Sequence, residues 1–122
     1  MSPSVRNTIA WILQGLIGLV FIGGGAYGLL HATESAKNFV DMGLPGGFAY
    51  LIGGAEVLGG MGLLVPRTTR LAAMGLMVIM AGAVFMHATK IPGGLKNGVP
   101  ALVLLLLLGL IIWLRRPEPP VA

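Results

Sequence analysis

Apolar residues dominate four stretches of the chain, and short polar segments separate them. The stretches cover residues 8–30, 48–65, 71–87 and 99–114. Each is apolar on all sides, which is too hydrophobic for the helices of a soluble bundle. A spanning helix needs about 20 apolar residues, so the third and fourth stretches span only where flanking side chains snorkel or the bilayer thins. The pattern predicts an all-α fold, a four-transmembrane-helix bundle in one domain, residues 1–122.

The segment between the first two stretches, residues 31–46, has its own pattern. Charged residues alternate there with Phe39, Val40, Met42 and Leu44. Gly43 followed by Pro45 is a helix stop signal. This pattern favours a short helix lying at the membrane interface, with an irregular loop as the alternative. Residues 91–98 are rich in turn formers, and Pro100 suits the first turn of the last helix, where its missing N–H costs nothing.

The composition supports a membrane protein. Of the 122 residues, 56% are hydrophobic and 10% are charged, whereas an ordinary soluble domain carries about 25% charged residues. The net charge of +4 is not arranged as a basic stripe, so we expect no nucleic-acid partner. The absence of cysteine excludes disulfides and Cys-ligated metals. A cleaved signal peptide is the alternative for residues 8–30, which exceed the usual 7–15-residue apolar core.

The charged flanks predict the orientation. Four spans put both termini and the short 66–70 loop on one side, which holds Arg6, Arg67, Arg70, Arg115 and Arg116. The opposite side holds Lys37, Lys90 and Lys96. The positive-inside rule therefore places both termini in the cytoplasm. Aromatic residues agree, because Trp11 and Trp113 fall near the cytoplasmic edge and Tyr27 and Tyr50 near the other.

Glycines predict a close contact between the first two helices. Helical spacing places Gly18, Gly25 and Gly28 on one face together with Gln14. Gly53 and Gly60 share a face of the second helix with Glu56. Small residues let membrane helices approach closely where lipid offers no hydrophobic drive to association.

Glu56 is the candidate for chemistry, because it lies near the middle of an apolar helix. A charge at that depth costs about 2.5–3.5 kcal/mol on insertion scales, so such a residue faces the bundle and finds a partner. Counting from the cytoplasmic ends puts Gln14 at the same depth. One interpretation is a structural hydrogen bond between Gln14 and a neutral Glu56. The other is a proton donor or acceptor that faces a small cavity.

His87 is the second catalytic candidate. In an antiparallel pair Glu56 is level with Met80, and His87 lies about 10 Å nearer the outer surface, within reach through a water or a ligand. The alternative for His87 is packing at the interface, and for Met80 it is core filling. His31 and Tyr27 at the outer edge complete the candidate ligand-binding set of Gln14, His31, Met80 and Tyr27. Two histidines without Glu-x-x-His spacing predict no metal site.

Residues 43–87 resemble the DoxX-like family of small bacterial integral membrane proteins. The matching features are Gly-Leu-Pro at 43–45, Gly-x-x-Glu at 53–56, Leu-x-x-Pro followed by Arg-Leu-Ala-Ala at 63–73, and Ala-x-x-x-His at 83–87. The resemblance implies a four-helix bundle in the bacterial plasma membrane, with Glu56 at the characteristic acidic position. Some members carry a lysine shortly after the first-helix glycine. Here that region reads Gly25-Ala26-Tyr27-Gly28, so a Glu–Lys pair does not transfer.

The resemblance also implies a function. Family members are associated with membrane redox systems, including a thiosulfate:quinone oxidoreductase and oxidative-stress complexes. We therefore expect a membrane subunit of a quinone-linked redox system, with quinone as the candidate cofactor. Its expected partners are the bilayer and an oxidoreductase subunit or a second copy of the chain. The alternative is a small membrane enzyme or carrier that acts on a lipophilic molecule through Glu56.

Overall fold

Helices make up most of the computed structural model, which describes residues 2–91 and 93–117. They are α1 (Pro3–Leu30), α2 (Ala32–Asp41), α3 (Phe48–Leu63), α4 (Thr69–Thr89), the 3-10 turn η1 (Gly94–Gly98) and α5 (Val99–Leu114). The all-α prediction is confirmed, and the four apolar stretches correspond to α1, α3, α4 and α5. In the described residues, α1, α4 and the segment Gly94–Leu114 are long and apolar enough to cross a membrane, whereas α3 has 16 residues. A fourth span by α3 stays a prediction.

Local signals explain where the helices begin and end. The Ser2 hydroxyl accepts a hydrogen bond from the Val5 N–H at 3.2 Å, and Pro3 occupies the first turn, so α1 begins before its apolar stretch. Pro100 lies in the first turn of α5, as predicted. The helix favoured for the 31–46 segment is present as α2. Gly43 follows it with a φ of +84°, a left-handed conformation that favours glycine at a helix end.

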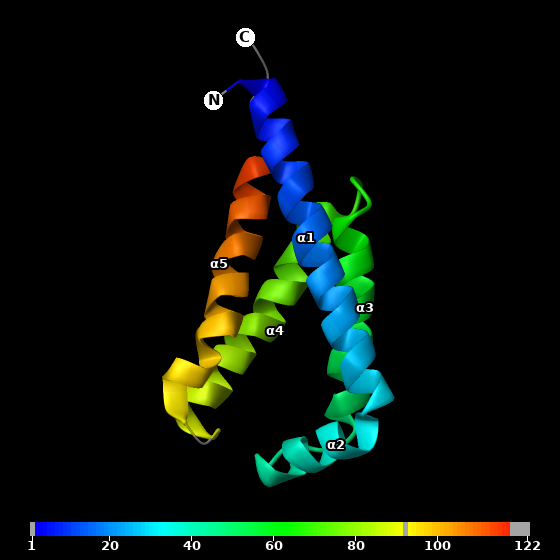
Figure 1. Cartoon of the computed structure of the whole chain (residues 1–122), viewed down its shortest axis with the longest axis vertical. Helices are drawn as coiled ribbons and strands as arrows, with labels where there is room; N and C mark the ends of the chain where they lie inside the picture. The colour runs from blue at the N-terminus through cyan, green and yellow to red at the C-terminus, as the bar shows by residue number, and fades with distance from the viewer. Residues whose placement is uncertain (1, 92, 118–122) are drawn as a thin grey trace.

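Glycines bring α1 and α3 into direct backbone contact. A Cβ on Gly18 would lie 2.9 Å from the Gly60 carbonyl oxygen, and one on Gly25 would lie 2.6 Å from the Gly53 oxygen. The predicted glycine faces therefore meet, and the two helices run side by side (Figure 1). Gly28 does not belong to the contact, because a Cβ added there would have no atom of another helix within 4 Å.

A second glycine face of α3 contacts α4, but only near the C-terminal end of α3. A Cβ on Gly62 would lie 2.9 Å from the Ala72 Cβ, and one on Gly59 would lie 2.6 Å from the Leu76 side chain. From this contact α4 runs beside α5 and away from α3 as it approaches the level of α2 (Figure 1). The buried core lies in the half where the helices converge and includes Ile17, Phe21, Leu63, Leu76, Leu108 and Ile111.

The two described ends of the chain meet at this converged end (Figure 1). Arg6 donates hydrogen bonds from Nε to the Leu114 carbonyl at 2.7 Å and from Nη2 to the Arg116 carbonyl at 2.8 Å. These bonds satisfy carbonyls that the end of α5 leaves without helical partners. The start of α1 and the end of α5 are therefore held together. Which side of a membrane this end faces stays a prediction.

Candidate functional site

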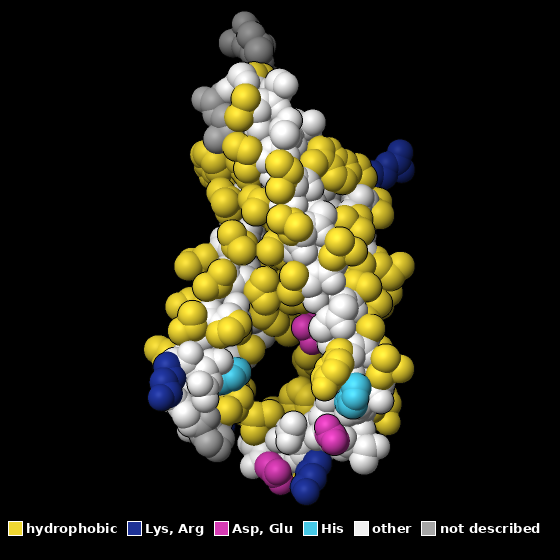
Figure 2. Space-filling model, viewed as in Figure 1, with side chains coloured by type: hydrophobic (Ala, Val, Ile, Leu, Met, Phe, Trp, Pro, Cys, Tyr) yellow, Lys and Arg dark blue, Asp and Glu magenta, His cyan; other side chains and the backbone are white. Residues whose placement is uncertain are grey.

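The diverging half of the bundle contains an apolar pocket of about 590 Å³. Its walls come from α2, α3 and α4, with Ile91 beyond the end of α4. Apart from Glu56 and His87, the residues that line it are apolar or glycine. Figure 2 shows an opening in this half, bordered by hydrophobic side chains together with an acidic side chain and a histidine. The volume falls in the range of natural sites for small lipophilic ligands.

The pocket arises from the spacing of small residues on α3. Gly59 and Gly62 draw α4 onto the C-terminal end of α3. One and two turns before Gly59, Glu56 and Ile52 occupy the same side of α3, where α4 has diverged, so both line the pocket. Close packing at one end of the α3–α4 pair therefore leaves a cavity at the other.

Glu56 lines this cavity and has no partner in the part of the chain that the structure describes. Its side chain is half-buried, and within residues 2–91 and 93–117 its carboxyl forms no hydrogen bond or ion pair. A carboxyl in apolar surroundings gains from any hydrogen bond that a ligand provides. It can accept such a bond when ionised and donate one when protonated.

His87 lines the same pocket from α4. Its Nδ1 lies 2.8 Å from the Ala83 carbonyl oxygen, one turn earlier on the helix. Because a carbonyl only accepts, Nδ1 carries the hydrogen, and Nε2 of the neutral ring remains an acceptor. Gly98 fits against the ring, since a Cβ there would lie 2.9 Å from the His87 Cβ. The pocket therefore contains two titratable groups, on facing helices.

The structure places the other predicted site residues in two groups. Met80 is buried and lines the pocket together with Glu56. Tyr27 and His31 lie outside its lining, at the end of α1. Their rings stack at 4.1 Å, and His31 Nδ1 donates to the Tyr27 carbonyl at 2.9 Å. The Tyr27 side chain is 64% exposed, so these two residues form a local pair on the surface of α1.

The first of the two interpretations of Glu56, a hydrogen bond with Gln14, is wrong. The fully buried Gln14 amide donates from Nε2 to the Leu63 carbonyl at 2.7 Å and to the Thr69 hydroxyl at 3.1 Å. Its Oε1 accepts from Arg115 Nε at 2.6 Å. The contacts of Gly18 with Gly60 and of Gly25 with Gly53 pair residues whose numbers sum to 78. In that register Gln14 lies beside the end of α3, about 12 Å along the axis from the level of Glu56.

Sequence reasoning did not assign the α2 side of the pocket. Phe39, Met42 and Leu44, from α2 and the residues after it, line the cavity together with Phe48 at the start of α3. The Phe39 and Phe48 rings contact edge to face with centroids 6.2 Å apart. The alternation of charged and apolar residues in this segment was the available signal, because an amphipathic helix buries its apolar face against something.

Together, the fold and the pocket define a class: an all-helical protein with apolar helices long enough to cross a membrane and a ligand-sized cavity between them. The model of the DoxX-like family matches residues 12–112, which is most of the chain, so the protein belongs to the DoxX-like family of membrane proteins. Neither the curated proteins nor the solved structures contain a match. The described residues hold no group of three His, Cys, Asp or Glu side chains able to bind a metal ion.

Proposed function

We propose that this protein binds a lipophilic molecule with a polar oxygen, of the quinone class, in the apolar pocket. The single observation that supports this proposal is the Glu56 carboxyl, which faces an apolar cavity of about 590 Å³ and has no partner among the described residues. A purely structural carboxyl would be expected to have a protein partner at this depth.

The lining suits both the apolar part of such a ligand and its oxygens. Aromatic and methionine side chains such as Phe39, Phe85 and Met86 accept an apolar ring or tail. Glu56 and the His87 Nε2 offer hydrogen bonds to oxygens at two places in the same cavity. In this proposal Glu56 hydrogen-bonds one ring oxygen and exchanges a proton with it, while electrons come from an oxidoreductase partner.

The proposed setting is a quinone-linked redox complex in the bacterial plasma membrane, in which this chain is a four-span subunit with both termini cytoplasmic. The arginine-rich converged end supports that orientation, and the amphipathic α2 supports an interfacial position for that helix. Reporter fusions at the C-terminus test the topology, and an external C-terminus would contradict it.

The second candidate is an enzyme or carrier that works without a partner, and the isolated carboxyl of Glu56 favours it as well. The two candidates differ in what accompanies the protein. An oxidoreductase that co-purifies in a fixed ratio favours the subunit. Turnover or ligand transfer by the purified chain alone favours the enzyme or carrier.

The experiment that tests the shared proposal is titration of the full chain in nanodiscs with a short-chain quinone. We expect saturable binding that Glu56→Leu weakens about tenfold or more, because a hydrogen bond to the ligand is lost in apolar surroundings. Glu34→Gln is the matched control, since Glu34 is an acid on α2 that does not line the pocket. Equal affinity for the wild type and Glu56→Leu would contradict the proposal.

Glu56→Gln separates hydrogen bonding from proton exchange. Glutamine keeps the size and a donor, so quinone binding should persist while proton-coupled activity is lost. Infrared difference spectra should show a protonated carboxyl C=O band at neutral pH, because charging Glu56 at this depth is costly. A carboxylate band in the resting protein would contradict this account of the site.

A further inference from the structure

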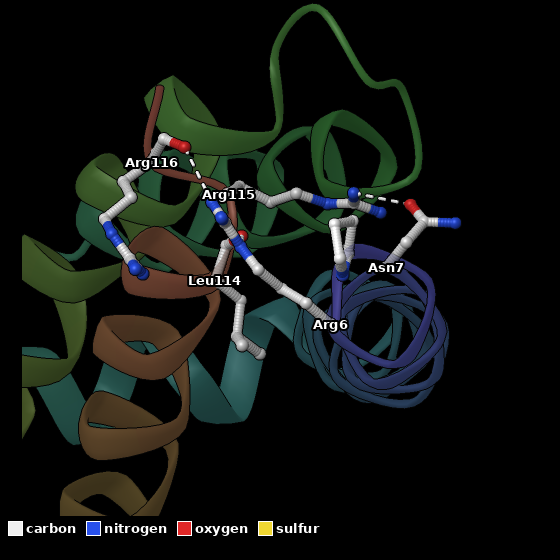
Figure 3. A pocket seen from close by; sticks show the side chains of 6 residues that line it. Arg6, Asn7, Leu114, Arg115 and Arg116 are labelled. Carbon is white, nitrogen blue, oxygen red and sulfur yellow. Dashed lines mark hydrogen bonds between the residues drawn. The ribbon is translucent and has the colours of Figure 1, made fainter. Parts of the chain in front are cut away.

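The apolar pocket contains an acid but no base to balance it. Glu56 is the acidic residue of the lining, and among the described residues no Lys or Arg side chain lines the cavity. The lysines on α2, just after α4 and in η1 are exposed: Lys37, Lys90 and Lys96. Arginines border a separate small pocket at the converged end of the bundle (Figure 3): Arg6, Arg115 and Arg116. The described part of the chain therefore provides no counter-ion for an ionised Glu56.

A ligand that carries a positive charge would supply that counter-ion. An unpaired charge at the depth of Glu56 is costly. Opposite charges attract one another more strongly in apolar surroundings than in water, because the dielectric constant is lower. The Glu56 side chain lines the cavity, so a ligand in the pocket can reach it. An organic cation with apolar substituents fits on both counts, since its charge pairs with Glu56 and its substituents contact the apolar walls.

The walls of the pocket also suit a cation. Phe39 and Phe48 line one side, with their rings edge to face and their centroids 6.2 Å apart. Phe85 lines the cavity from α4. A cation over the face of an aromatic ring is attracted by the quadrupole of the ring, and quaternary ammonium ions are recognised in this way. Polarizable methionine side chains complete the walls: Met42, Met80 and Met86.

His87 is the other titratable group that lines the pocket. Its neutral ring does not repel a cation, whereas a protonated ring would. The titratable residues of α2 and of the end of α1 are exposed and lie outside the lining: Tyr27, His31, Glu34, Lys37 and Asp41. Protonation of Glu56 or of His87 therefore disfavours a bound cation, and both effects weaken binding as the pH falls.

We propose that the apolar pocket binds a lipophilic organic cation in exchange for the proton of Glu56. The O–H bond of the protonated carboxyl breaks, the proton passes to water, and the carboxylate forms an ion pair with the cation. Proton and cation therefore exclude each other at this site. The proposal shares its pocket with the proposed function but does not depend on quinone binding, because a neutral quinone accepts a hydrogen bond from the protonated carboxyl.

The test uses the full chain in nanodiscs, with methyltriphenylphosphonium as the probe. Calorimetric titration in buffers of different ionisation enthalpy measures the affinity and the number of protons released. We expect saturable binding that releases about one proton per cation at neutral pH. Affinity should rise about tenfold per pH unit while the carboxyl of the free protein is protonated, because proton and cation compete for it.

Glu56→Gln keeps the size of the side chain but cannot ionise. It breaks no hydrogen bond to a described residue, so it should fold, and it should weaken cation binding at least about tenfold and release no proton. Asp41→Asn is the matched control, because Asp41 is an exposed acid that precedes the lining residue Met42. It should bind the cation as the wild type does. The neutral hydrocarbon of the same shape, with carbon in place of phosphorus, should compete at least about tenfold more weakly than the cation.

Infrared difference spectra give a second readout of the exchange. Addition of the cation should remove the protonated C=O band of Glu56 and produce a carboxylate band. An unchanged C=O band in the cation-bound protein would overturn the proposal.

The outcomes also separate this proposal from the proposed function. It is overturned if the cation does not bind, if binding releases no proton, or if the neutral hydrocarbon competes equally. It is overturned as well if Asp41→Asn loses as much affinity as Glu56→Gln, or if Glu56→Gln still releases a proton, which would assign the proton to His87. Cation exchange without quinone binding would contradict only the proposed function, and quinone binding without cation exchange would contradict only this proposal.

Discussion

Two polar side chains, one in each half of the bundle, differ in whether the protein satisfies them. At the converged end, the Gln14 amide is fully buried and uses both its oxygen and its nitrogen in hydrogen bonds with α3, α4 and Arg115. In the diverging half, the Glu56 carboxyl faces an apolar cavity with no partner among the described residues. A satisfied polar group specifies how helices pack, whereas an unsatisfied one is available to a ligand. The difference indicates a structural role for Gln14, and it is the basis on which we propose ligand binding at Glu56.

Glycine packing shows the same division. Gly18 and Gly60 leave no room for a side chain, while Gly82 borders the apolar pocket with nothing within 4 Å of an added Cβ. Identical substitutions in the two halves therefore test the comparison directly.

The largest effect is expected for Gly60→Leu. Its Cβ would lie 2.6 Å from the Gly18 carbonyl oxygen, so α1 and α3 must separate. Overpacking of this kind costs about 1–3 kcal/mol or more, and we expect a sharp loss of folded protein in detergent. Gly15→Leu on α1 is the control, because that position is open. Wild-type thermal stability of Gly60→Leu would show that the backbone contact is not essential.

The next effect is expected for Gln14→Leu. It removes the amide that joins α1 to the Leu63 carbonyl and to Arg115, which leaves buried polar groups without a partner at a cost of about 1–3 kcal/mol. Thermal unfolding in detergent measures this cost. Thr8→Ala serves as the control, since its exposed hydroxyl bonds only within α1. A stability equal to wild type would mean that water replaces the amide.

Glu56→Leu should leave stability within about 0.5 kcal/mol of wild type or raise it, because no hydrogen bond to a described residue is lost and an apolar side chain suits the cavity. The same unfolding measurement applies, with Glu34→Leu as the matched exposed acid. A loss as large as that of Gln14→Leu would reveal a structural partner for the carboxyl and would erase the contrast between the halves.

The smallest effect on stability is expected for Gly82→Leu. Replacing glycine inside a helix gains up to about 1 kcal/mol of helix propensity, and the new side chain enters the open pocket rather than a backbone. Stability should therefore be unchanged or slightly higher, while quinone binding is lost because the cavity is filled. Retained binding at wild-type affinity would place the ligand elsewhere.

Helix positions and contact faces were largely readable from the sequence. The apolar stretches gave α1, α3, α4 and α5, since helices in lipid must be apolar over their whole surface. The 3.6-residue period put Gly18 with Gly25 and Gly53 with Gly60 on single faces, and these faces meet. Glu56 was also recognisable, because a carboxyl in such a stretch is costly wherever it points.

Only the tertiary structure decided which residues meet across helices. Counting depth from loop ends paired Gln14 with Glu56, but the register of α1 on α3 is set by where glycine backbones touch, and α1 extends beyond its apolar stretch to Pro3. The divergence of α4 from α3, the cover that α2 provides and the convergence of Arg6 with Arg115 depend on contacts distant in sequence. Periodicity can be read from one helix alone, whereas a pocket forms where several helices do not pack against one another.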